Sequence, residues 1–341
     1  MTINNKNNAS NKTLINTDTQ SRNNSLTHKY SYNPETGMLD PTYNSVFKML
    51  MSNERNKEST ICFLNVIYDG IIVPKIREIH LLPTEIDIND IESKAAIMDF
   101  HCIDDKLQEH TIEMQRVRDG DILKRVSIYA CNTHGNQIKR KRHGQYYKSD
   151  DKITKIDYDR VTTTHSLLIS TNKIQNHPNK YFSSDIRVDR FDRNIELYND
   201  IIYTRLDLSL VSDTLDNCRD DRERLGFLIK MVNTMTKEQL DTFVHHNPYA
   251  KPLITALNQT SYTSDEMLVL EYAFLKEAAI ANEMDELKTR AETAEARADM
   301  AEKKARDERI LMVKRMLADG ITTDIIEKYT GLTKEEILKL R

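Results

Sequence analysis

The sequence predicts an α/β protein that continues into an α-helical C-terminal region. Three observations predict this class. Apolar residues recur at helical spacing over residues 41–71, the apolar period becomes two over residues 95–115, and residues 264–318 contain neither proline nor glycine. The alternating segment predicts paired strands, and the uninterrupted segment predicts one long helix.

Composition excludes several classes of protein. The chain has 341 residues, of which 39% are hydrophobic and 30% charged, and no apolar run approaches the ~18 residues that a membrane-spanning helix needs. The net charge of −4 is too small for a surface that binds nucleic acid everywhere, so contact with DNA would need a local basic patch. Four scattered cysteines predict reduced thiols, and the first 25 residues lack the apolar segment of a secretory signal. We therefore expect a cytoplasmic protein that has no contact with membranes.

The chain divides into five expected segments. Residues 1–36 are rich in Asn, Ser and Thr and predict a disordered tail, because they can bury little apolar surface. The other four segments are a folded core, a helical extension, a long helix that can form a coiled coil, and a short tail that resembles a helix-turn-helix: residues 37–205, 206–263, 264–318 and 319–341.

The first elements should be helical. Asp40 is expected to cap a helix that has Pro41 at its first position. A second apolar run from Ile61 to Ile71 continues the helical pattern, and an extended passage follows over residues 76–82.

The next segment predicts a β-hairpin with a defined register. If its two strands meet around the polar turn between them, Phe100 lies opposite Ile112 and Asp99 lies opposite Glu113. In this register apolar side chains lie opposite apolar side chains, and Gln115 lies on the same polar face as the two carboxylates. Carboxylates on adjacent strands can hold Mg²⁺, which prefers oxygen ligands. The pattern alone, however, favours an ordinary hairpin with a solvated face.

After the hairpin, the sequence predicts a helix, a loop and a strand in turn. A helix should begin at Asp121 and end in a basic run, and residues 145–162 should form a polar loop. Residues 167–169 predict a short buried strand, and apolar clusters over residues 194–244 look helical.

The long C-terminal helix carries a heptad pattern. Its apolar residues step by four and three along Ile280, Met284, Leu287, Ala291, Ala294, Ala298, Ala301 and Ala305. This seam could join a second copy of the chain, but alanine buries little area, and a solvated connecting helix is an equal alternative. The tail ends in a predicted capping box, Thr333 with Glu336. Because Glu335 and Glu336 would face phosphate, a compact structural tail is favoured over a DNA-reading helix.

Several motifs together resemble a known family. These are Asp40-Pro-Thr-Tyr43 followed by Val46-Phe-Lys48, Met98-Asp-Phe100, Ile112-Glu-Met-Gln115, and Lys124-Arg-Val-Ser-Ile-Tyr129. In order and spacing they resemble the PD-(D/E)XK nuclease family transposases, also called recombination-promoting nucleases. The similar segments span residues 38–169.

This resemblance implies a restriction-endonuclease-like core, in which a mixed sheet is flanked by helices. It implies that Asp99, Glu113 and the backbone carbonyl of Met114 bind a catalytic Mg²⁺, for which Mn²⁺ could substitute, and that DNA is the partner. Gln115 would be the third catalytic residue, at a position where the wider superfamily has lysine. A Gln115→Lys substitution would then either supply a useful charge or break a bond that holds the site together.

Further basic residues are candidates for contact with phosphate. They are Lys48, Arg125, Lys139, Arg140, Lys141 and Arg142. Cys131 and His134 have a spacing that zinc can use, but without a second pair of ligands zinc is not predicted. The expected function is a metal-dependent DNA endonuclease. The alternative is a catalytically decayed nuclease fold that acts as a DNA-binding or oligomeric interaction protein.

Overall fold

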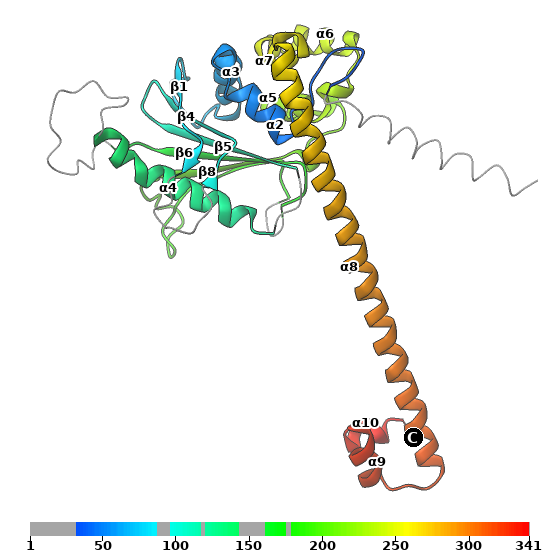
Figure 1. Ribbon diagram of the computed structural model, residues 1–341. Helices are drawn as coiled ribbons and strands as arrows, with labels where there is room; N and C mark the ends of the chain where they lie inside the picture. Colours follow the sequence, from blue (N-terminus) through cyan, green and yellow to red (C-terminus); the bar gives the residue numbers. More distant parts are fainter. Residues whose placement is uncertain (1–31, 87–95, 117–119, 143–160, 175–178, 341) are drawn as a thin grey trace, which may run out of the picture. The chain divides into compact units, whose positions relative to one another are not determined.

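The computed structural model describes residues 32–86, 96–116, 120–142, 161–174 and 179–340 (Figure 1). The chain forms two compact units, Met1–Lys276 and Glu277–Arg341, whose boundary falls inside one continuous helix. Most of the predicted disordered tail lies outside the described residues. Its last residues take part in a turn, in which Tyr32 forms a β-bridge with Leu39.

A mixed six-stranded sheet forms the centre of the first unit, in the order β1-β4-β5-β6-β8-β7. The strands are β1 Ile79–Leu81, β4 Phe100–Asp104, β5 Glu109–Gln115, β6 Thr164–Ser170, β7 Phe182–Asp185 and β8 Ile201–Asp207. Strands β5, β6 and β8 are parallel, and the other pairs are antiparallel. A second sheet pairs β2 (Glu85–Ile86) with β3 (Ala96–Ile97).

Helices flank both faces of the large sheet, as the sequence predicts (Figure 1). The α-helices are α2 Asn44–Met51, α3 Lys57–Ile67, α4 Ile122–Arg142, α5 Asp221–Met231, α6 Lys237–His246, α7 Lys251–Leu257, α8 Ser264–Ala318, α9 Thr323–Thr330 and α10 Lys334–Leu338. Short 3₁₀ helices lie between them, at Glu54–Asn56, Leu208–Leu210, Leu215–Asn217, Val232–Thr234, Pro248–Ala250 and Gln259–Ser261.

Strand β6 shows how the two faces are divided. Leu167 and Ile169 belong to the main core, which also includes residues of α2, α3, α5 and α7. Leu168 points the other way and packs with Ile122 and Val126 of α4. Because successive side chains of a strand point to opposite faces, α4 covers one face of the sheet, and α2, α3, α5 and α7 pack against the opposite face.

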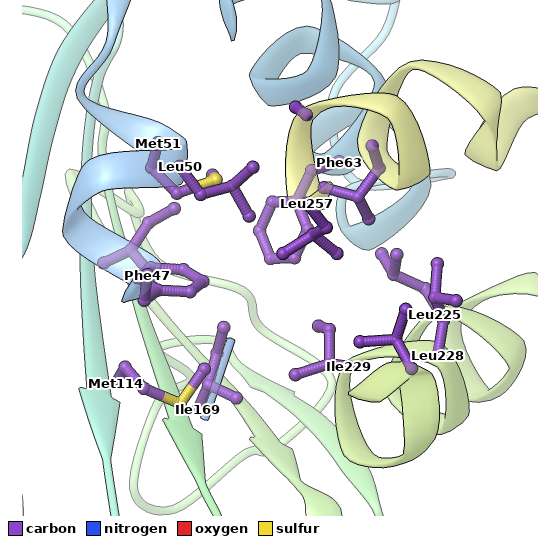
Figure 2. Close-up of a cluster of buried hydrophobic side chains, with 14 of the residues drawn as sticks. Phe47, Leu50, Met51, Phe63, Met114, Ile169, Leu225, Leu228, Ile229 and Leu257 are labelled. Carbon is purple, nitrogen blue, oxygen red and sulfur yellow. The ribbon is translucent and has the colours of Figure 1, made fainter. Parts of the chain in front are cut away.

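The main core joins segments that are distant in the sequence (Figure 2). Phe47 and Phe63 from the first helices pack in it together with Leu228 of α5 and Leu257 of α7. Each fully buried side chain of this kind contributes roughly 1.5–3 kcal/mol. The helical extension predicted over residues 206–263 is therefore part of the same folded unit as the sheet.

The hairpin has the predicted register, with Phe100 paired to Ile112. Asp104 closes its turn, since Oδ1 accepts hydrogen bonds from the backbone N–H of Lys106 and of Gln108, each at 2.9 Å. The alternative of a solvated face is wrong, because all five residues of β4 are buried.

Two sequence predictions are wrong. Helix α2 begins at Asn44 and not at Pro41, because Asp40 Oδ1 accepts bonds from Thr42 N (3.0 Å) and Thr42 Oγ1 (2.6 Å) and so stabilises a turn ahead of the helix. The apolar residues predicted as helical after residue 194 begin instead with strand β8, whose Ile-Ile-Tyr-Thr run is rich in β-branched and aromatic residues.

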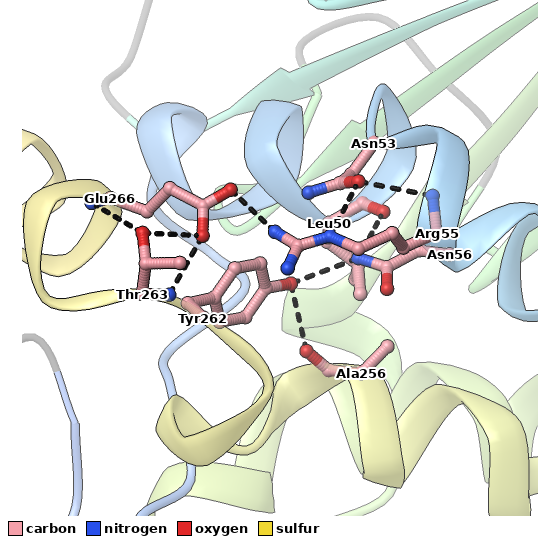
Figure 3. Close-up of polar contacts among 8 residues, drawn as sticks. All are labelled: Leu50, Asn53, Arg55, Asn56, Ala256, Tyr262, Thr263 and Glu266. Carbon is pink, nitrogen blue, oxygen red and sulfur yellow. Dashed lines mark hydrogen bonds and ion pairs between the residues drawn. The ribbon is translucent and has the colours of Figure 1, made fainter.

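The long helix has the predicted bounds, and polar contacts fix its first turn (Figure 3). Glu266 forms an ion pair with Arg55 and accepts a bond from Thr263 N at 2.7 Å. The buried Tyr262 hydroxyl donates to the Ala256 carbonyl at 2.8 Å and accepts from Asn56 Nδ2 at 3.0 Å. These contacts attach the start of α8 to the main core.

The second unit closes on a small core of its own. Val313 from α8, Ile326 from α9 and Ile337 from α10 are buried together. Gly331 ends α9 in the left-handed region, at φ +69°, and Thr333 forms the predicted capping box with Glu336. Across the described residues, no helix is long and apolar enough to cross a bilayer.

We predict that Tyr262→Phe lowers the free energy of unfolding by about 1–2 kcal/mol, because it leaves the buried Ala256 carbonyl without its hydroxyl donor. Tyr272→Phe is the matched control, since Tyr272 is 74% exposed, and should change stability by less than about 0.5 kcal/mol. Urea unfolding followed by circular dichroism measures both. Equal effects of the two substitutions would contradict the role given to the Tyr262 hydroxyl.

Candidate functional site

Two carboxyl groups meet at the edge of the hairpin. Asp99 lies just before β4, and its Oδ2 accepts a hydrogen bond from the backbone N–H of Met114 at 2.8 Å. Glu113 lies on β5, is 6% exposed, and shares a side-chain hydrogen bond with Asp99. The structure therefore brings together the two carboxyls that the hairpin register pairs.

The carboxyl pair retains a proton at neutral pH. Burial and the charge of Asp99 raise the pKa of Glu113 to about 9. Burial also raises the pKa of Asp99, although the hydrogen bonds from Glu113 and from Met114 oppose this effect. The shared bond raises the pKa of Glu113 and lowers that of Asp99, so the proton belongs to Glu113.

Glu113 has one oxygen that its protein neighbours leave unsatisfied. Its Oε1 is buried and has no hydrogen-bond partner within the described parts of the chain. An unsatisfied buried oxygen is costly, and a cation bound there would remove the cost. The pair therefore fits a divalent cation, which would displace the shared proton.

The donor set is small. Over the ranges that the structure describes, no group of three or more His, Cys, Asp or Glu side chains could hold a metal ion. A cation at Asp99 and Glu113 would need backbone oxygen and water for its other ligands. Mg²⁺ is commonly bound in this way, by one or two carboxylates and several waters.

Two cationic side chains act on the carboxyl pair from different helices. Lys48 of α2 and Arg125 of α4 both favour the ionised forms of Asp99 and Glu113, which lowers their pKa values against the effect of burial. The site therefore has positive charge beside the carboxyls, where a phosphate could bind.

Gln115 links the Arg125 guanidinium to strand β5. Its Oε1 accepts a hydrogen bond from Arg125 Nη2 at 2.7 Å. The sequence predicts the face on which Gln115 lies and offers two roles for it, as a catalytic residue or as the source of a bond that holds the site together, but it does not name the partner of that bond. The structure shows that it also positions a guanidinium, a contact between β5 and α4 that no local pattern reveals.

Arg116 is a residue that the sequence reasoning missed. Its guanidinium lies 3.5 Å from the centroid of the Tyr43 ring, 3.3 Å from Thr42 Oγ1 and 3.6 Å from Asp40 Oδ2. The Asp-Pro-Thr-Tyr motif thus binds the residue that directly follows Gln115. Its contribution is to fix the end of β5.

The side chains of the remaining basic candidates lie outside the described residues. These candidates, Lys139, Arg140, Lys141 and Arg142, end helix α4.

Three His and Cys side chains, His101, His134 and Cys131, have structural partners. His101 contacts Glu109 Oε2 at 3.1 Å and the Pro83 carbonyl at 3.0 Å. His134 contacts Thr164 Oγ1, and Cys131 Sγ lies 3.9 Å from the Tyr203 hydroxyl. Cys131 and His134 thus have different neighbours.

Comparison with models of known protein families gives a match. The model of a family described as PD-(D/E)XK nuclease family transposase matches residues 41–286, which include the large sheet, the carboxyl pair and the first part of α8. Searches of curated proteins and of solved structures gave no match. The mixed sheet with flanking helices is consistent with the restriction-endonuclease-like fold. The chain belongs to the PD-(D/E)XK nuclease family transposases.

Proposed function

We propose that the protein is a metal-dependent DNA endonuclease that hydrolyses phosphodiester bonds and acts in the cytoplasm. The observation that carries the proposal is the buried pair of Asp99 and Glu113, with its shared proton and its unsatisfied oxygen, beside Lys48 and Arg125. Membership of a nuclease family supports DNA as the substrate.

In this proposal Asp99, Glu113 and the backbone carbonyl of Met114 hold Mg²⁺, for which Mn²⁺ can substitute. When bound, the ion would activate a water molecule and offset charge on the phosphate. Glu113 first has to release its proton, because both carboxylates must be ionised to bind a cation.

The other residues bind and orient the substrate. Lys48 and Arg125 supply positive charge for a phosphate oxygen, and Gln115 fixes the direction of the Arg125 guanidinium. A positioned charge stabilises the transition state more than a mobile one, because it needs no reorganisation during the reaction. The basic end of α4, residues 139–142, is proposed to contact the DNA backbone.

A second candidate function is a decayed nuclease that only binds DNA or a protein partner. One observation favours it: residue 115 is glutamine, and its amide oxygen is engaged by Arg125. Residue 115, the position that is lysine in the wider superfamily, therefore supplies no ammonium group beside the carboxyls.

We predict that Asp99→Ala lowers cleavage by at least about 100-fold, because it removes one of two carboxylate ligands. Nicking of supercoiled plasmid across a Mg²⁺ titration measures the effect, and circular dichroism checks the fold. Asp216→Ala, at an exposed carboxyl, is the control and should cut like the wild type. If Asp99→Ala also cuts at the wild-type rate, the activity belongs to another site; if the wild type does not cut at all, the decayed nuclease is the correct function.

We predict that Gln115→Lys lowers single-turnover cleavage about tenfold, because the new ammonium would lie against the Arg125 guanidinium. The double variant Gln115→Lys with Arg125→Gln again has one cation and one amide at these two positions, and should recover part of the lost cleavage rate. An equal or faster rate for Gln115→Lys alone would show that a charge at residue 115 is sufficient.

The shared proton predicts a pH dependence of stability. The pKa of Glu113 is about 9 in the folded protein and 4.5 without the fold, so its stabilising contribution is complete below pH 4.5 and is lost as pH rises through 9. Between pH 5 and pH 9 the metal-free wild type should lose at least about 1 kcal/mol relative to Glu113→Gln, which cannot ionise. Urea unfolding at several pH values measures the difference, and parallel curves for the two proteins would refute the shared proton.

A further inference from the structure

Residues 280–305 of α8 present an uncovered apolar seam. Large side chains lie at its start, where Ile280 is 47% exposed, Met284 44% and Leu287 55%. Five alanines continue the seam at heptad spacing, and the described side chains on all sides of this stretch are exposed. Large apolar side chains on a helix normally face a protein core, but in this stretch the helix buries none of them.

Charged residues flank the seam in a regular order. With Met284, Ala291, Ala298 and Ala305 at position a, the g positions are Glu283, Arg290, Arg297 and Lys304. The e positions of the same heptads are Lys288, Glu295, Glu302 and Arg309. In a parallel two-stranded coiled coil, each g residue meets the e residue five positions later on the other helix.

These flanks are complementary between two copies of the chain. Glu283 would meet Lys288 of the second copy, Arg290 would meet Glu295, and Arg297 would meet Glu302. Only Lys304 would meet a like charge, Arg309. Symmetry makes each attractive contact twice, so a parallel dimer gains six opposite-charge contacts against two repulsive ones.

An antiparallel pairing over the same seam fits less well. It would bring g residues together with g residues and e residues with e residues, so that Arg290 would lie against Arg297 of the second copy. Glu283 would meet Lys304 and Lys288 would meet Glu295, which gives four opposite-charge contacts against two repulsive ones, fewer than in the parallel pair. Ion pairs within the helix do not prevent the parallel arrangement, because Lys288–Glu292, Arg290–Glu286 and Lys304–Glu308 are exposed and 3.7–3.9 Å long.

We propose that residues 280–305 form a parallel, in-register coiled coil with a second copy of this chain. The apolar seam supplies the contact, and the e and g charges select the same chain as the partner. The two nuclease units then continue from the same end of the coil. This assembly does not depend on cleavage activity, so its test is independent of the proposed function.

Charge exchange in the full-length protein tests the partner. The wild type should be a concentration-dependent dimer by sedimentation velocity. Arg290→Glu with Arg297→Glu, and separately Glu295→Lys with Glu302→Lys, should each raise the dimer dissociation constant at least about tenfold. A mixture of the two variants should form a heterodimer, because every altered contact again joins opposite charges.

The charge-exchange experiment has a matched control variant. Lys303→Glu with Lys314→Glu changes the same number of charges outside the seam and should leave the dimer unchanged. A wild type that stays monomeric at all concentrations, or a mixture that stays monomeric when the wild type dimerises, would overturn the proposal.

Cysteine cross-linking tests the orientation, in a Cys131→Ser background that removes the exposed native thiol. Ala298→Cys occupies an a position and faces itself in a parallel dimer, so it should form a disulfide-linked dimer under mild oxidation. Asp299→Cys points outward and is the control. If Ala298→Cys cross-links only when a cysteine also replaces Leu287, the helices are antiparallel and the parallel arrangement is wrong.

Discussion

The alternation of side chains along β5 is the constraint on which the site depends. Ile112 and Met114 enter the main core, while Glu113 and Gln115 emerge on the opposite face beside Arg125. A slip of one residue would place carboxylate in the core and methionine in the site. The antiparallel partner β4 and the parallel partner β6 both hold this register, so the same packing that stabilises the sheet also aims the carboxyl of Glu113.

A second group of contacts fixes the point where β5 ends. Arg116 packs on the Tyr43 ring and approaches Asp40, so the segment ahead of α2 restrains the strand just after Gln115. The Asp-Pro-Thr-Tyr motif is distant in sequence from the carboxyls, and three of its residues contact Arg116. Its role is to position the site, because it holds the strand that carries Glu113 and Gln115. This role explains why the motif resembles one of the nuclease family.

The parts of the fold that the sequence predicted have local causes. The hairpin register follows from apolar alternation, and the capping box at Thr333 follows from a four-residue pattern. Strand β8 was missed because its pairing with β6 joins residues far apart in the chain, which leaves no local period to read. The bond between Gln115 and Arg125 was missed for the same reason, since it depends on how α4 packs against the sheet. Asp40 was assigned to the wrong element because a turn and a helix start use the same capping chemistry.

The proton held by Glu113 has a consequence for the order in which ligands can bind. While that proton is present, the site contains two cations, Lys48 and Arg125, and only one carboxylate, Asp99. A phosphate group that approaches this form meets net attraction instead of the repulsion of two carboxylates. In the proposed function, nucleic acid would therefore associate before the divalent ion, and scarcity of metal would yield a bound, uncut complex. In that function the proton on Glu113 would keep this carboxyl neutral while a strand binds, so that binding of the strand would precede its cleavage.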